Sequence, residues 1–109
     1  MKTRRQDELD IDIMDGVYLQ VTGPTYETPA EAEMYASMGA DVVGMSLACE
    51  TIALRHMGTR VLGFSCVTDF CPNVDGGAVT HEMVKENAEK VSDRFVGLIK
   101  GVVKMIDLM

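Results

Sequence analysis

Apolar and polar residues alternate along residues 16–23, where Val17, Leu19 and Val21 fall on one side. A period of two predicts a β-strand, because successive side chains of a strand point to opposite faces. The dipeptide Gly23-Pro24 follows at once and is typical of a turn. The pattern therefore predicts a strand that ends before residue 24.

A helix start follows in the segment TPAE. Thr28 is the expected N-cap, Pro29 takes the first helical position and Glu31 the third. A hydroxyl followed three residues later by Glu is a capping box, and Pro is favoured at the first position. We therefore predict a helix that begins after Thr28 and ends at Gly39.

The strand–helix pattern then recurs. Residues 41–45 (DVVGM) form a short apolar run, Ser46 is placed to cap the helix 47–57, and Gly58 is placed to end it. Residues 60–68 (RVLGFSCVT) form a second apolar run. Short apolar runs bounded by turn signals are typical of buried strands, so we predict two further strands here.

The last predicted helix is the longest. Thr80 is its expected cap, with Val79 and Val84 as a hydrophobic staple. Its apolar residues recur in alternating steps of four and three, which predicts one narrow stripe: Val84, Ala88, Val91, Phe95, Leu98, Val102, Met105 and Met109. Such a stripe suits a coiled-coil seam or packing on a sheet, and Gly97 and Gly101 disfavour the free-standing coil. We expect it to pack on the sheet of its own domain.

Strand–helix order repeated three times predicts an α/β fold with a mostly parallel sheet flanked by helices. We expect residues 16–109 to form one domain and the polar residues 1–15 to lead into it. In a parallel sheet the connections that leave the carboxyl ends of the strands gather at one edge, where ligands bind. The unusual residues of these connections are Tyr26, Glu27, Met45, Ser46, Thr68 and Asp69.

Composition narrows the class of protein. The chain has 109 residues, 47% of them hydrophobic, which suits one small domain. Its net charge of −7 argues against nucleic-acid binding, because binding phosphates requires clustered Lys and Arg. No apolar stretch is long enough to cross a bilayer. Three cysteines without framework spacing favour a reducing cytoplasm. We expect a cytoplasmic protein with no nucleic-acid or membrane partner.

Several candidate residues have simple alternatives. Ser46 is either a helix cap or, with the N–H groups of the helix start, an anion site. Glu27 beside Tyr26 suits a flat heterocycle, which the ring can stack on and the carboxylate can hydrogen-bond. Asp69 can equally be a turn former. His56 falls in the last turn of its helix, where an exposed histidine is the simpler interpretation.

A metal site is considered and rejected. Residues 71–82 approach the spacing of an EF-hand calcium loop, with Glu82 at the twelfth position. The first ligand, however, is Cys71, and a predicted strand precedes the loop where an EF-hand has a helix. CVTDFC lacks a second ligand pair for zinc. We expect no metal.

Three segments in this order resemble the trimeric class of purine nucleoside phosphorylases: GPTYETPAE, GADVVGMS and RVLGFSCVT. The resemblance covers residue 16 to about residue 100 and corresponds to the C-terminal half of that family. It implies a partial three-layer phosphorylase-like fold. The N-terminal half, which supplies much of the family's phosphate site, has no counterpart in the resemblance.

The resemblance also implies an activity, in which phosphate cleaves the N-glycosidic bond of a purine nucleoside to give the free base and ribose 1-phosphate. It implies no cofactor beyond phosphate as co-substrate, and a homotrimer. The residues that it places around the substrates are Tyr26 on the purine face, Glu27 at N1–H, Val43, Gly44 and Met45 along the base and ribose, Ser46 at phosphate, Thr68 and Asp69 near N7 and the 6-substituent, and His81 at the ribose 5′-hydroxyl. Glu27, Asp69 and His81 are the catalytic candidates.

The implied base preference is divided. Asp69 stands where relatives acting on 6-oxopurines have Asn, and relatives that cleave methylthioadenosine carry Asp there. An ionised Asp only accepts, which suits a 6-amino group, whereas Glu27 suits the N1–H of a 6-oxopurine. Alternatively Asp69 is protonated on burial and donates to N7.

A second hypothesis belongs to another class. The chain would be a non-catalytic remnant that binds purine weakly, or an assembly module that pairs through an exposed strand edge or through the stripe of its last helix.

Overall fold

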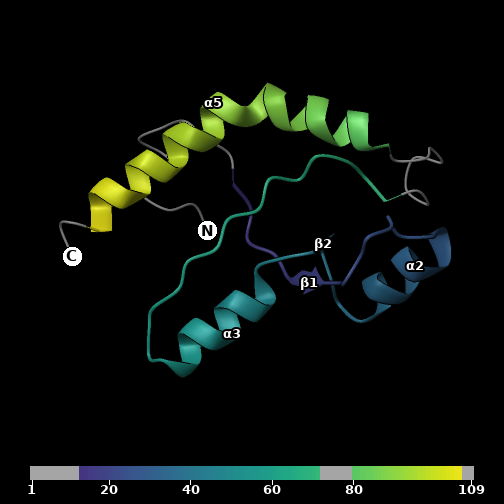
Figure 1. Ribbon diagram of the computed structural model, residues 1–109, viewed down its shortest axis with the longest axis horizontal. Helices are drawn as coiled ribbons and strands as arrows, with labels where there is room; N and C mark the ends of the chain where they lie inside the picture. Colours follow the sequence, from purple (N-terminus) through teal and green to yellow (C-terminus); the bar gives the residue numbers. More distant parts are fainter. Residues whose placement is uncertain (1–12, 72–79, 107–109) are drawn as a thin grey trace.

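A computed structural model of the chain describes residues 13–71 and 80–106. Figure 1 shows its elements in the order β1 (Tyr18–Gln20), α2 (Pro29–Ser37), β2 (Val42–Gly44), α3 (Ala48–His56) and α5 (His81–Ile106). The described part of the chain contains no helix that is long and apolar enough to cross a membrane.

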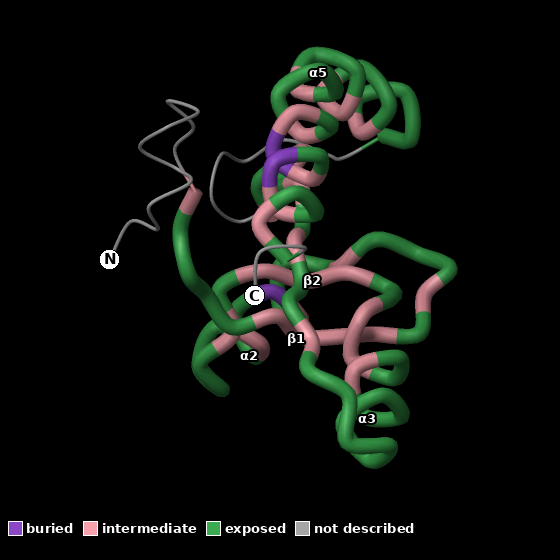
Figure 2. Tube along the Cα trace, turned by 90° about the vertical axis from the view of Figure 1, so that its left-hand side faces the viewer, coloured by how far each residue is buried: buried purple, intermediate pink, exposed green. Residues whose placement is uncertain are grey.

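The two strands pair in parallel, with Leu19 opposite Val43. A hydrogen bond from Val21 N to Gly44 O, 2.8 Å long, extends the pairing past the end of β1. Helices α2 and α3 lie on opposite sides of the strand pair (Figures 1 and 2). A parallel pair with a helix in the crossover confirms the α/β class that the sequence predicts.

The prediction of a third strand over residues 60–68 is wrong. Residues 60–68 form no strand and run as an extended segment between the strand pair and α5 (Figure 1). A strand needs a neighbour that satisfies its backbone N–H and C=O groups, and no described backbone group pairs with this segment. Leu62 and Val67 remain 66% and 62% exposed. The apolar pattern of the segment is therefore one that the described residues alone do not bury.

The start of α2 confirms the predicted capping box. The Glu31 N–H donates to Thr28 Oγ1 at 3.2 Å, and the Thr28 N–H donates to Glu31 Oε1 at 3.1 Å. The hydrogen bonds from Thr28, first from its backbone and then from its side chain, hold the pKa of Glu31 below its usual value. Gly39 follows the helix with φ +94°, the left-handed conformation expected after a helix end.

Replacing Thr28 with alanine should lower the free energy of unfolding by about 1 kcal/mol at pH 7, because the first turn of α2 loses its acceptor. Since the folded pKa of Glu31 is lowered, its contribution is complete above the usual carboxyl pKa and is lost as pH falls through the lowered value. The difference between parent and variant should therefore shrink in acid. Urea unfolding at neutral and acidic pH measures it, with Thr28→Ser as the matched control. Equal stability of parent and alanine variant at pH 7 would contradict the cap.

The predicted cap of α3 is wrong. Leu47, with φ +76°, is the N-cap and provides no side-chain hydrogen bond. The side chains of β1 satisfy the helix start instead: Cys49 N–H donates to Gln20 Oε1 at 3.0 Å, and Ser46 N–H donates to Tyr18 Oη at 3.3 Å. These acceptors are 28 and 29 residues away in sequence, which a pattern of local caps does not reveal.

The end of α3 follows the prediction. Gly58, with φ +81°, comes directly after the C-cap residue Met57. His56 lies in the last turn and is exposed, as the sequence suggests for a surface histidine near a helix carboxyl end.

Helix α5 begins as predicted, since Met83 N–H donates to Thr80 Oγ1 at 3.2 Å. Val79 lies outside the described residues, so the predicted staple of Val79 with Val84 is not tested. The predicted stripe is the less exposed side of the helix as far as Met105, with Leu98 only 4% exposed (Figure 2), and its last residue, Met109, lies outside the described residues. Contrary to the prediction, the main neighbour of α5 is the segment 60–71 and not the sheet (Figure 1).

Candidate functional site

The connections that leave β1 and β2 touch one another. Gly23 has φ +67°, which favours glycine, and a Cβ at this position would lie 2.6 Å from Met45 Sδ. The thioether of Met45 thus occupies the space that a larger residue at position 23 would need. Two of the three predicted connections therefore meet at the carboxyl edge of the parallel pair.

Val43 and Gly44, the predicted base- and ribose-lining residues, belong to β2 and are half-buried. The Tyr18 hydroxyl lies directly over Gly44, where a Cβ would collide with it. The same hydroxyl accepts the Ser46 N–H. The ring of Tyr18 therefore fixes the backbone that leads from β2 into the turn before α3.

Ser46 is exposed and lies just before α3. Its hydroxyl makes no hydrogen bond within residues 13–71 and 80–106, which leaves it free to bind a ligand at the helix start. Two N–H groups of this region, those of Ser46 and Cys49, already have side-chain acceptors. The part of an anion site that this helix start offers is therefore smaller than the sequence suggests.

Tyr26 and Glu27 lie between the turn and α2. Tyr26 is 38% exposed, and Glu27 is half-buried. The pKa of Cys71 is raised, mainly by burial and further by the negative charge of Glu27. The pKa of Tyr35 is raised by burial, by the charge of Glu31 and, least, by Glu27. The Glu27 carboxylate therefore lies near α2 and near the end of the segment 60–71.

Thr68 and Asp69 are both half-buried and both bind one residue of α5. Asn87 Nδ2 donates to Thr68 O at 2.7 Å and to Asp69 Oδ1 at 2.8 Å. The other carboxylate oxygen, Asp69 Oδ2, is buried without a partner among the described residues. A buried unpaired oxygen needs a donor, so Asp69 is able to accept a hydrogen bond from a ligand.

Sequence reasoning missed Asn87. One signal was present: Asn87 lies next to Ala88 on the less exposed side of α5, between the stripe residues Val84 and Val91. A polar side chain on the buried side of an amphipathic helix needs a partner. Its partner could not be named, because the interaction joins residues 18 and 19 positions apart in the sequence.

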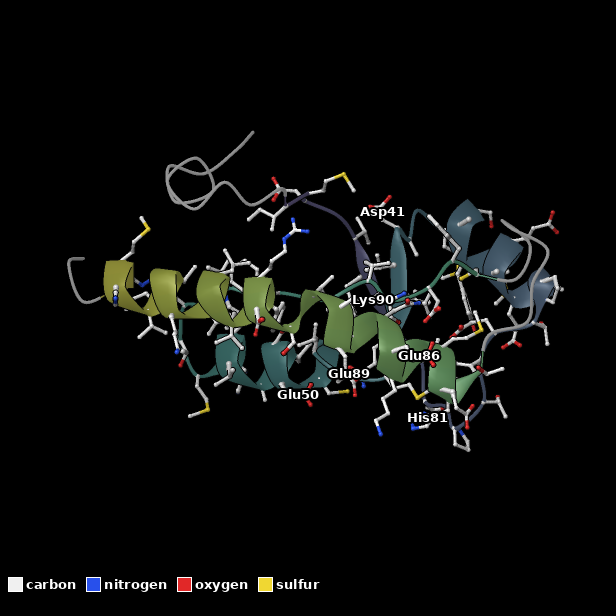
Figure 3. The ribbon with its side chains drawn as sticks, turned by 90° about the horizontal axis from the view of Figure 1, so that it is seen from above. Asp41, Glu50, His81, Glu86, Glu89 and Lys90 are labelled. Atoms are coloured by element: carbon white, nitrogen blue, oxygen red, sulfur yellow. The ribbon has the colours of Figure 1, made fainter. Side chains whose placement is uncertain are left out.

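His81 is the first residue of α5 and is exposed. Figure 3 shows it at the end of the helix, before Glu86, Glu89 and Lys90 along the axis. No hydrogen bond joins it to another candidate residue in the part of the chain that the structure describes. The contacts thus connect Gly23 with Met45, Asp69 with α5, and the Glu27 charge with Cys71, whereas His81 stands apart.

The described residues contain no group of three or more His, Cys, Asp or Glu side chains that could hold a metal ion. The polar candidate groups are hydrogen-bond acceptors, the carboxylates of Glu27 and Asp69, and the Ser46 hydroxyl, which can accept or donate; the contact at the carboxyl edge itself is that of Gly23 with Met45. An aromatic ring such as that of Tyr26 and a carboxylate such as that of Glu27 are the group types that bind the face and the edge of a flat molecule.

The sequence is similar to parts of known proteins. A family model described as the phosphorylase superfamily matches residues 2–104. The chain is 45% identical over 96 residues to purine nucleoside phosphorylase 1 of Bacillus subtilis, which covers 88% of this chain and 35% of that protein. It is 41% identical over 98 residues to purine nucleoside phosphorylase 1 of Geobacillus stearothermophilus (90% and 36%), and 38% identical over 94 residues to the purine nucleoside phosphorylase of Bos taurus (81% and 32%). The chain therefore spans about a third of the length of the curated relatives that it matches.

Proposed function

The chain belongs to the phosphorylase superfamily, and we propose that it binds the base and ribose of a purine nucleoside and takes part in cleavage of the nucleoside by phosphate. The bacterial and bovine relatives are named purine nucleoside phosphorylases. The turn Tyr26-Glu27 and the pair Thr68-Asp69 are the base-binding residues of this proposal, and Met45 lies against the sugar.

The observation that carries the proposal is the contact between the connections that leave β1 and β2. The Glu27 carboxylate affects the pKa of Cys71, two residues after Asp69, so the turn and the segment 60–71 approach one another. Met45 contacts Gly23 at the start of the same turn. A purine needs a stacking surface and hydrogen-bonding groups at its edge, and these connections provide both types.

In the proposed reaction an oxygen of phosphate forms a bond to C1′ while the C1′–N9 bond breaks. The electron pair of the broken bond stays on the purine, which then takes up a proton. No cofactor is needed, because phosphate itself is the nucleophile. The proposed tasks of this chain are to orient the base and to stabilise the charge that develops on it, with Ser46 as the phosphate contact and His81 at the 5′-hydroxyl.

Incubation of the full chain with inosine or adenosine, with and without phosphate, tests the proposal. We expect release of hypoxanthine or adenine that depends on phosphate, with an equal amount of ribose 1-phosphate, measured by chromatography. The reaction without phosphate is the control. If the chain neither releases a base nor binds hypoxanthine or adenine in calorimetry, the proposal is wrong.

A second candidate is purine binding without turnover. One observation favours it: the N–H groups of Ser46 and Cys49, near the start of α3, already have side-chain acceptors. In the same experiment this candidate gives calorimetric binding of a purine base and no phosphate-dependent release. Glu27→Ala would then remove the hypoxanthine binding.

We further propose that the chain works in the cytoplasm in purine salvage, as part of a homotrimer. Large apolar side chains on its surface support an assembly, among them Ile52 and Met57, which are 69% and 75% exposed. Burial of such side chains against further protein is favourable. Light scattering of the purified chain measures its mass, and a monomer at all concentrations would contradict the trimer.

A further inference from the structure

The side-chain nitrogen of Asn87 donates hydrogen bonds to two groups of the segment 60–71. Nδ2 carries two hydrogens, and its two acceptors, Thr68 O and Asp69 Oδ1, are 2.7 Å and 2.8 Å away. One hydrogen is available for each acceptor. Because the Thr68 carbonyl and the Asp69 carboxylate bind the same NH₂ group, the side chain of Asp69 is fixed relative to its own backbone.

This arrangement gives the two oxygens of Asp69 different tasks. Oδ1 is occupied by Asn87, whereas Oδ2 is buried and has no partner among the described residues. As a carboxylate, Asp69 can only accept, so Oδ2 offers an acceptor to whatever lies against it. In the proposed function Asp69 is a base-binding residue, so the base is the ligand from which Oδ2 would accept a hydrogen bond.

We propose that Asn87 is a positioning residue that fixes Asp69 with Oδ2 toward the base and thereby gives the chain affinity for 6-aminopurines. This inference rests on the proposed function. The exocyclic amino group of a 6-aminopurine is a donor that can satisfy Oδ2. The 6-oxygen of a 6-oxopurine is an acceptor, so it gains nothing from a carboxylate held in this way. Asn87 therefore decides how strongly Asp69 discriminates between the two kinds of base.

Calorimetry of the full chain with adenine and with hypoxanthine tests this role. In Asn87→Ala we expect the affinity for adenine to fall about tenfold, while that for hypoxanthine stays within about twofold, because at the 6-position only adenine has a donor for Oδ2. Lys85→Ala, an exposed residue of the same helix, is the matched control and should leave both affinities unchanged. Circular dichroism verifies that each variant is folded.

A double-variant cycle separates positioning from a general structural role. In the Asp69→Asn background, Asn87→Ala should no longer lower the affinity for adenine relative to hypoxanthine. If Asn87→Ala fails to fold, Asn87→Ser keeps a single donor and should give a smaller loss of the same sign. Two outcomes would overturn this inference and leave the proposed function standing. In the first, Asn87→Ala lowers the affinities for adenine and hypoxanthine equally. In the second, the parent binds hypoxanthine but shows no measurable binding of adenine. A parent that binds neither base overturns both.

Discussion

Replacing Glu27 with alanine is expected to weaken the binding of hypoxanthine by roughly 10- to 100-fold, which corresponds to about 1.5–3 kcal/mol for a hydrogen bond to a charged group. Glu27 is half-buried beside the exposed ring of Tyr26, and its charge affects the pKa of Cys71. In the proposed complex its carboxylate accepts the N1–H of a 6-oxopurine. Adenine has no proton at N1, so its binding should change far less. Calorimetry with both bases measures the difference.

Two controls make this result specific. Glu33 is an exposed acid of α2, and Glu33→Ala should leave both affinities unchanged while removing the same net charge. Glu27→Gln keeps the shape of the side chain but replaces the carboxylate with an amide, so it should retain part of the affinity through its carbonyl oxygen. Equal affinities of the parent and Glu27→Ala for hypoxanthine would remove Glu27 from the base site.

The local parts of the fold are those that the sequence predicts well. The capping box of Thr28 and Glu31 and the turn at Gly58 depend on residues within a few positions of each other, and both are present as predicted. The cap of α3 depends instead on Tyr18 and Gln20, far away in the chain. No local pattern distinguishes a helix start that its own serine caps from one that a neighbouring strand caps.

The prediction of a strand at residues 60–68 fails for a related reason. Its apolar pattern is typical of a segment that is buried on both sides, such as a strand in the middle of a sheet. Within the described residues the sheet has only β1 and β2, and the segment has no strand beside it. A sequence pattern reports the environment that suits a segment, whereas strand formation also requires a hydrogen-bonding neighbour.

For the candidate site, the topology of the chain was the useful guide. The parallel order placed the connections after β1 and β2 at one edge, and the contact of Gly23 with Met45 is there. Asn87 could not be predicted, because it acts through a side chain that bridges two separate segments. Its role emerges from two distances and from the unpaired oxygen of Asp69.

Replacing Asp69 with asparagine is expected to shift the base preference toward hypoxanthine, with a combined change in the adenine-to-hypoxanthine affinity ratio of roughly 100-fold, about 3 kcal/mol. The physical reason is the hydrogen bond that the Asn87 side chain donates to residue 69. Its Nδ2 can only donate, so it requires an acceptor at the position of Asp69 Oδ1. An asparagine at position 69 must therefore turn its carbonyl oxygen toward Asn87 and its NH₂ group toward the base. That NH₂ group can donate to the 6-oxygen of hypoxanthine but repels the amino group of adenine.

The double variant separates the effects of Asp69 and Asn87 on the base preference. Without the Asn87 donor, the amide of residue 69 is free to turn, so Asp69→Asn combined with Asn87→Ala should discriminate less between the bases than Asp69→Asn alone. Calorimetry of the four proteins with each base supplies all the terms of the cycle. If Asp69→Asn leaves the affinity ratio unchanged, Asp69 does not face the 6-position, and the buried oxygen Oδ2 serves only the packing of the segment 60–71 against α5.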